Sequence, residues 1–199
     1  MPALDVAGEF ETIERLFKPL SHPEWGRGLA DDVAALPSRP GHELILTKDA
    51  IVEGVHFLPD DPLDTVARKL LRVNLSDLAA KGAEPFGYLL ACFWSERCGW
   101  PEREAFAAGL AEDQARFGVH LLGGDTVRMS GPLSFSLTAL GWAPTGKAVS
   151  RAGAQVVLLL QLVRLDLDLL RAHGLAGGER GTDVCGRVVD RRVVAEELG

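Results

Sequence analysis

Hydrophobic residues recur along most of this chain in two periods, one typical of helices and the other typical of strands. Apolar positions three and four residues apart predict helices over residues 8–20, 62–82 and 101–118, each bounded by proline or glycine. Alternating or continuous apolar runs predict strands over residues 43–49, 51–57, 86–94, 119–125 and 132–142. This order of elements favours an α/β or α+β layered fold over an all-helical or all-strand one.

The helix predicted after Pro62 has an apolar face that ends in a carboxylate. Asp61 is placed to accept a hydrogen bond from the first turn, and proline suits the first helical position because no N–H is needed there. The stripe then consists of Leu63, Val66, Leu70, Val73 and Asp77. A lone charge at the inner end of an apolar stripe is costly to bury. We therefore expect Asp77 to be paired with a cation.

Composition excludes several classes of protein. The 199 residues include 21 Lys+Arg and 28 Asp+Glu, a formal net charge of −7, which argues against a nucleic-acid-binding protein. With 47% hydrophobic and 25% charged residues, the chain is typical of a globular protein with a real core. No run approaches the roughly 18 apolar residues that cross a bilayer, and the acidic start does not resemble a signal peptide, so we expect a cytoplasmic protein. Without a C-x-x-C pair, the sequence supports neither a disulfide framework nor a zinc site at Cys92, Cys98 and Cys185.

Aspartates recur where predicted strands or helices meet glycine-rich turns. They are Asp31 and Asp32 in GLADDVAAL, Asp49 in LTKDAIVEGVHF, Asp77 in NLSDLAAKGA and Asp125 in LLGGDT. Taken singly, each is explained by a turn, a helix cap or a solvated surface. If they converge, each pair at about 4 Å repels by about 4 kcal/mol at an effective dielectric constant near 20, so only a bound cation makes the cluster stable. Hard oxygen ligands without His or Cys suit Mg²⁺ completed by substrate phosphates, which indicates nucleotide chemistry.

A second motif competes as the phosphate-binding site. Residues 141–148, GWAPTGKA, are one residue short of the P-loop pattern G-x-x-x-x-G-K-[ST], and the missing hydroxyl is the group that holds the magnesium ion. The following AVSRAGA is a poor helix, whereas a P-loop needs a helix whose N-terminus points at the phosphates. The pattern therefore disfavours a P-loop.

Two further residues have alternative roles. His56, in EGVHF, is either a packed, hydrogen-bonded imidazole or part of a site. Arg151, in SRAGA, is either a surface charge or a planar fork for phosphate oxygens.

Five motifs occur in a fixed order, namely DDVAAL, D-x-x-VEGVHF, NLSDLAA-x-GA-x-P, LLGGDT and SRAGA. Over residues 8–154 they resemble the thiamine-monophosphate kinases, part of a larger family of ATP-using enzymes that includes aminoimidazole ribonucleotide synthetase. The resemblance implies the N-terminal, ATP- and Mg-binding domain of that fold over residues 1–153, with a mixed sheet and helices on one face. It also implies transfer of the ATP γ-phosphoryl group onto thiamine monophosphate without a protein nucleophile, because positioning and charge neutralisation suffice.

The resemblance implies a role for each matching position. It implies magnesium ligands at Asp31, Thr47, Asp49, Asp77 and Asp125, ATP contacts at Gly124, Asp125 and Arg151, and a contact with thiamine monophosphate at His56. Mg²⁺ and ATP are accordingly the expected cofactor and co-substrate. The resemblance also implies a homodimer with the nucleotide near the subunit boundary.

The sequence departs from the family pattern at several places. Ala30 stands where a glycine usually precedes the paired aspartates, and Lys48 puts a positive charge beside Asp49, either displacing an ion or pointing outward by strand alternation. Residues 154–199 form an atypical tail, which we expect to be a truncated or aberrant start of the family's second domain. Two alternatives stay open: a non-catalytic Mg-ATP-binding remnant, and another ATP-using enzyme of the same superfamily.

Overall fold

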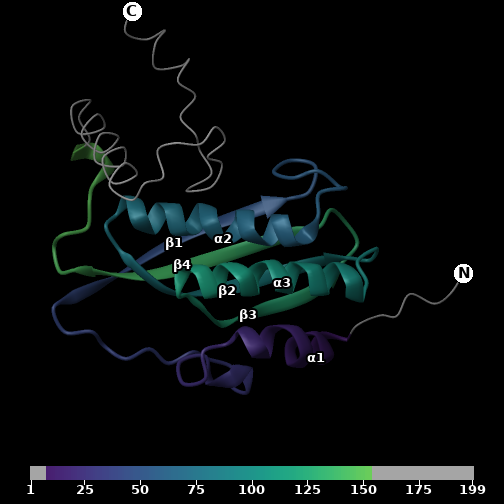
Figure 1. Cartoon of the computed structure of the whole chain (residues 1–199), viewed down its shortest axis with the longest axis horizontal. Coiled ribbons are helices and arrows are strands. Elements are labelled where there is room, and N and C mark those ends of the chain that lie inside the picture. The colour runs from purple at the N-terminus through teal and green to yellow at the C-terminus, as the bar shows by residue number, and fades with distance from the viewer. Residues whose placement is uncertain (1–7, 154–199) are drawn as a thin grey trace, which may run out of the picture. The chain divides into compact units, whose positions relative to one another are not determined.

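The structure is a computed structural model that describes residues 8–153 of the chain (Figure 1). Its helices and strands are α1 (Glu9–Thr12), β1 (His42–Val52), α2 (Leu63–Ala80), β2 (Glu84–Ser95), α3 (Trp100–Phe117), β3 (His120–Met129) and β4 (Ser134–Pro144). Helical turns at Ile13–Phe17 and Lys18–Leu20 continue α1, and single turns occupy Arg27–Leu29 and Arg151–Gly153. All four strands and the three helices belong to one compact unit that ends at Ala148.

The four strands form one mixed sheet in the order β1-β4-β2-β3. β4 pairs antiparallel with both β1 and β2, whereas β2 and β3 run parallel and are joined by the α3 crossover. α2 and α3 lie side by side over one face of this sheet (Figure 1). The structure confirms the mixed sheet with helices on one face, and it places β1 and β3 at opposite edges.

The core lies between the sheet and these two helices. Phe106 of α3 stacks on Phe135 of β4 with ring centroids 4.1 Å apart, and Trp94 of β2 packs edge-on against both rings. The same core buries five α2 residues, Val66, Ala67, Leu70, Leu71 and Leu78. The opposite face of the sheet is partly open and exposes Leu44, Leu46, Leu89 and Val127.

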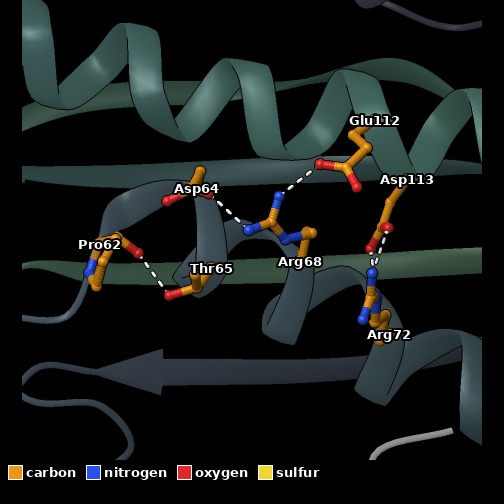
Figure 2. Close-up of polar contacts among 7 residues, drawn as sticks. All are labelled: Pro62, Asp64, Thr65, Arg68, Arg72, Glu112 and Asp113. Carbon is orange, nitrogen blue, oxygen red and sulfur yellow. Dashed lines mark hydrogen bonds and ion pairs between the residues drawn. The ribbon is translucent and has the colours of Figure 1, made fainter. Parts of the chain in front are cut away.

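Polar contacts join α2 to α3 along their shared surface (Figure 2). Arg72 donates two hydrogen bonds, of 2.8 and 2.9 Å, to the buried carboxylate of Asp113. One turn earlier, Arg68 bridges Asp64 of its own helix at 2.6 Å and Glu112 of α3 at 2.5 Å. These bridges fix the position of α2 relative to α3.

The segment before β1 is held against the β3 edge of the sheet. Ser21 pairs with Leu121 as an isolated parallel bridge, and the His22 N–H donates to the Leu121 carbonyl at 3.0 Å. The His22 ring stacks on Trp25 with centroids 4.0 Å apart, and it meets His120 edge-on. These contacts bring the loop that follows, with its paired aspartates, next to β3.

Two of the sequence predictions about strands are wrong. The two strands predicted over residues 43–49 and 51–57 are the single strand β1 followed by a turn at Gly54, whose φ is 78°. The glycine-rich turn predicted at the end of the 119–125 strand does not form, because β3 runs through both glycines to Met129. The helices predicted over residues 62–82 and 101–118 are present within two residues of their expected bounds. The helix predicted over residues 8–20 is α-helical only over Glu9–Thr12 and continues as the turns at Ile13–Phe17 and Lys18–Leu20. Asp61, however, accepts the Leu58 N–H at 2.7 Å and does not cap α2.

Burial also differs from the predictions. Asp77 is exposed, because the buried face of α2 runs through Val66, Leu70, Asn74 and Leu78, to one side of it. Phe117 is exposed at the end of α3 although it continues the apolar spacing of that helix, and Leu89 is exposed although it lies within the continuous apolar run of residues 86–94.

Cys92 and Cys98 are free thiols, and Cys185 lies with the rest of the 154–199 tail outside the described residues. A search of the helices between residues 8 and 153 finds none with the length and apolar character needed to span a membrane.

Candidate functional site

Asp31 and Asp125 line the same cavity at the β3 edge of the sheet. The cavity has a volume of about 440 Å³. Its walls include the helix that begins at Glu9, the loop of residues 29–34 and β3 residues 121–126. Glu9 and Asp32 add two more carboxylates, and no Lys or Arg occurs among the described residues of the lining. A cavity with this charge favours a divalent cation and, through it, an anionic ligand.

Gly124 lets β3 approach β2 closely beside Asp125. Its φ of 153° lies in the region that favours glycine, and a Cβ there would lie 1.7 Å from the Leu90 carbonyl oxygen. The register between β2 and β3 shifts just before this point. Asp125 follows directly, stays exposed and accepts the Thr126 N–H at 2.8 Å. The glycine therefore sets where the Asp125 carboxylate meets the cavity.

Two neighbouring residues favour the ionised form of the Asp31 carboxyl group. Arg27 donates to Asp31 Oδ2, and the Asp32 N–H donates to Oδ1 at 2.8 Å. The hydrogen bond from Arg27 lowers the pKa of the Asp31 carboxyl, and the Asp32 N–H lowers it further. An ionised carboxylate is the form that a hard cation binds.

Thr47 and Asp77 form a second group at the other edge of the sheet. Thr47 Oγ1 donates to Asp77 Oδ2 at 3.1 Å, which links β1 to the last turn of α2. Asp49 lies two residues further along β1 on the same face as Thr47, because side chains alternate in a strand. Lys48 lies on the opposite face, where its ammonium group donates to Thr138 at 3.4 Å. Of the two roles considered for Lys48, the structure therefore supports the outward one.

The described residues do not gather the predicted magnesium ligands into one cluster within a single chain. Asp31 and Asp125 lie at the β3 edge, whereas Thr47, Asp49 and Asp77 lie at the β1 edge. The strand order separates these edges by three strand spacings, about 14 Å. Residues 8–153 contain no group of three or more His, Cys, Asp or Glu side chains arranged to hold a metal ion.

Each of the two groups nevertheless fits the chemistry of Mg²⁺. This ion is bound by oxygen atoms, through one or two carboxylates, and takes water and substrate phosphates as its other ligands. Asp31 with Asp125, and Asp77 with the Thr47 hydroxyl, supply oxygen atoms of this kind. Because each group is small, it suits a metal that arrives with a phosphate ligand.

His56 lies apart from both groups. In the turn after β1 its Nδ1 accepts the Val52 N–H at 3.1 Å, and its backbone carbonyl accepts a hydrogen bond from Lys69. Lys69 precedes Asp77 by two turns of α2, which is about 12 Å along the helix axis. With Nδ1 engaged, Nε2 is the ring atom left to contact a ligand.

Residues 141–148 do not form a P-loop, which agrees with the sequence interpretation. Gly141 and Trp142 belong to β4, and residues 145–146 form a turn. In the described part of the chain, residues 147–150 are irregular and only the single turn at Arg151–Gly153 follows. Arg151 is exposed and belongs to a second unit that starts at Val149, so its position relative to the cavity is not described.

Sequence reasoning missed two features, one a partner of a cavity carboxylate and the other part of the cavity wall. One is Arg27, and its spacing of four residues from Asp31 was the available signal. The other is the first helix, whose apolar spacing predicts a buried face. Phe10 starts that face but is 83% exposed and lines the cavity together with Glu9.

Residues 30–143 match the family described as AIR synthase related protein, N-terminal domain. The chain belongs to this family. The matched region contains β1, α2, β2, α3 and β3, and all of β4 except Pro144. It includes every predicted magnesium ligand, and it ends before Arg151.

Two curated relatives of this chain are thiamine-monophosphate kinases. That of Caulobacter vibrioides is 57% identical over 155 residues, which cover 77% of this chain and 44% of the relative. That of Escherichia coli (strain K12) is 41% identical over 152 residues, which cover 74% of this chain and 45% of the relative. The chain therefore spans less than half the length of either relative.

Solved structures agree with this relationship. The crystal structure of thiamine-monophosphate kinase from Stenotrophomonas maltophilia K279a has a TM-score of 0.57 at 39% identity, over 62% of this chain and 38% of that chain. A structure described as AaThiL complexed with AMPPCP and TMP has a TM-score of 0.55 at 26% identity, over 83% of this chain and 58% of that chain. The resemblance to thiamine-monophosphate kinases is thus confirmed.

Proposed function

We propose that this chain binds ATP with Mg²⁺ and thiamine monophosphate, and that it takes part in the phosphoryl transfer that yields thiamine diphosphate. The observation that carries the proposal is that Asp31 and Asp125, far apart in the sequence, line one cavity together with Gly124. All three residues lie in the part of the chain that matches the family. The structure of a similar protein holds AMPPCP, an analogue of ATP, and TMP, which supports these substrate classes.

In this proposal the chain's own residues bind and position, and no side chain acts as a nucleophile. Asp31 and Asp125 hold the metal at the cavity wall, and Gly123 and Gly124 line the cavity beside Asp125. Mg²⁺, when bound, neutralises phosphate charge and polarises the transferred group. Positioning and charge neutralisation are sufficient for phosphoryl transfer, because its transition state is loose.

The proposal includes a homodimer, because one chain carries the predicted magnesium ligands in two separate groups. If the β1 edge of one copy lies beside the β3 edge of the other, Thr47 and Asp77 meet Asp31 and Asp125 across the subunit boundary. The partly open face of the sheet, with exposed Leu44, Leu46, Leu89 and Val127, offers apolar area for such an association. Each site then needs both copies.

A second candidate function is binding of Mg-ATP without turnover. The observation that favours it is that Asp31 and Asp125 line one cavity, whereas His56, the predicted contact with thiamine monophosphate, does not line it. A protein that holds the nucleotide with no acceptor beside it binds ATP and releases it unchanged. Both candidates assign the nucleotide site to a domain over residues 1–153, and both include a cytoplasmic location, where ATP is available.

Calorimetric titration of the 199-residue chain tests the proposal. ATP with Mg²⁺ is added first, then thiamine monophosphate, and thiamine diphosphate is measured by chromatography. Asp125→Asn should abolish magnesium-dependent ATP binding, whereas Asp60→Asn, which changes an exposed carboxylate outside the cavity lining, should preserve it. Binding without product supports the second candidate. A chain that does not bind ATP in the presence of Mg²⁺ contradicts both.

A further inference from the structure

Arg27 forms an ion pair with Asp31, one of the carboxylates that line the cavity. Its guanidinium group donates to Asp31 Oδ2, while the Asp32 N–H occupies Oδ1. Both oxygen atoms of this carboxylate therefore already accept a hydrogen bond. The Arg27 and Asp31 side chains are 46% and 42% exposed, so an ion from solvent can reach the pair and compete for Oδ2.

The backbone around Arg27 is held in a conformation that its side chain disfavours. Arg27 and Leu29 have φ values of 49° and 54°, in the left-handed region that costs energy for any residue except glycine, and Gly28 lies between them. The Ala30 N–H closes this turn on the Arg27 carbonyl at 3.2 Å. Such conformations persist only where the surrounding structure enforces them, and they concentrate at ligand clamps and switch regions.

Gly26 anchors this turn to the sheet. A Cβ at Gly26 would lie 2.4 Å from Ser21 Oγ and 3.2 Å from the Leu121 carbonyl oxygen, so the turn packs closely against β3 at this residue. The Gly26 N–H also donates to the His22 carbonyl at 3.0 Å. The turn is therefore fixed against β3, with Arg27 directed onto Asp31.

The charges around the cavity give Arg27 two possible anionic partners. The lining carries four carboxylates and, among its described residues, no Lys or Arg. Because Arg27 pairs with Asp31, its guanidinium group places a positive charge at the border of the cavity. A divalent cation at Asp31 repels the guanidinium group and replaces it. A phosphate chain bound to that cation attracts the guanidinium group, whose planar fork matches two phosphate oxygens.

We propose that Arg27 is an exchangeable counter-ion. It holds Asp31 while no divalent cation is bound, and it contacts the phosphate chain of the nucleotide once the cation has taken Asp31. This inference rests on the proposed Mg-ATP function and adds a positioning residue to it. It requires opposite effects on two ligands, because Arg27 competes with the cation and assists the nucleotide. A merely structural role changes both affinities in the same direction.

Titration calorimetry of the full chain, with Mg²⁺ alone and with ATP at saturating Mg²⁺, tests this exchange. In Arg27→Gln, we expect the affinity for Mg²⁺ alone to rise about two- to fivefold, the strength of an exposed ion pair. The affinity for ATP should fall about tenfold, because a charged hydrogen bond is lost. The matched control is Arg39→Gln, which removes the same charge from a similarly exposed pair with Glu84 and should change neither affinity.

Arg27→Gly is a second variant that controls for misfolding. Glycine favours the left-handed backbone conformation at this position, and the substitution also removes the guanidinium group. It should reproduce both shifts. Parallel losses of both affinities, or an unchanged affinity for Mg²⁺ alone, overturn the exchange and leave the Mg-ATP function standing. A wild-type chain that binds neither Mg²⁺ nor ATP overturns the proposed function and the exchange with it.

Discussion

Thr47 Oγ1 donates a hydrogen bond of 3.1 Å to Asp77 Oδ2, and this contact joins an edge strand to the last turn of a helix. Asp77 is exposed, so the bond contributes little to stability. Its consequence is geometric, because it holds a hydroxyl and a carboxylate side by side as oxygen ligands for a hard cation.

Replacing Thr47 with valine should therefore affect binding more than stability. We expect the affinity for Mg-ATP to fall about tenfold and the free energy of unfolding to change by less than about 1 kcal/mol. Calorimetry and urea denaturation measure the two effects. Thr138→Val is the control, because its hydroxyl accepts from Lys48 on the opposite face of the sheet. An equal loss of affinity in the control contradicts a specific role for Thr47.

Mixing two binding-deficient variants tests whether each site needs two copies. Asp77→Asn and Asp125→Asn remove predicted ligands from opposite edges of the sheet. In a composite dimer, a mixed pair has one site with both substitutions and one site with neither. Half of the dimers are mixed and half of their sites are intact, so calorimetry should recover about a quarter of the wild-type number of sites. A mixture that binds no more than the separate variants contradicts the composite site.

Removing the Asp113 carboxylate should destabilise the helix pair more than removing the carboxylate beside it. Asp113 is fully buried against Arg72, whereas Glu112, which pairs with Arg68, is 61% exposed (Figure 2). We expect Asp113→Ala to lower the free energy of unfolding by about 3 kcal/mol, because a partly buried guanidinium loses a paired carboxylate. Glu112→Ala should cost about 1 kcal/mol or less. Urea denaturation measures the free energy of unfolding of both variants. Equal losses in the two variants would contradict a larger contribution from the buried ion pair.

Adjacent glycines in β3 should differ sharply in their tolerance of alanine. A Cβ at Gly124 would lie 1.7 Å from a backbone oxygen, whereas at Gly123 its nearest contact is a Leu89 methyl group at 3.5 Å. Gly124→Ala should cost about 3 kcal/mol or more and displace Asp125, while Gly123→Ala should cost less than about 1 kcal/mol. Thermal denaturation tests the stabilities. A Gly124→Ala protein as stable as wild type would show that β3 can move away from β2.

Periodicity predicts the elements of this fold because it reports each element's own buried face. The run at residues 86–94 becomes β2, and Pro101 and Gly118 mark the ends of α3 to within one residue. Periodicity does not report how far a neighbouring element extends, so it does not predict whether the end of an apolar stripe is covered. Phe10 continues an apolar stripe yet is exposed, and Asp77 lies at the end of another stripe yet faces solvent.

The candidate site depends on strand order, which no local pattern encodes. The motifs identify Asp31, Asp77 and Asp125 by their resemblance to a family, but β4 inserts between β1 and β2 and so separates the β1 ligands from the β3 ligands. Glycine is equally compatible with a turn and with an irregularity inside a strand. Gly124 lies at a strand irregularity because β3 pairs with β2 there, and a local sequence pattern does not predict that pairing.

Acidification should destabilise the packing of the N-terminal segment on β3. Partial burial of the His120 ring lowers its pKa below the ordinary value, and His22, whose ring meets it edge-on at 5.1 Å, lowers it further. Because the pKa is lower in the folded state, this histidine contributes its full stability above the unfolded value of about 6.5, and the contribution is lost as the pH falls below that value toward the folded pKa. We expect the Tm of the wild type to fall between about pH 7 and pH 5.5, and His120→Gln to show a shallower decline in scanning calorimetry. A variant with the wild-type slope would assign the acid sensitivity to other groups.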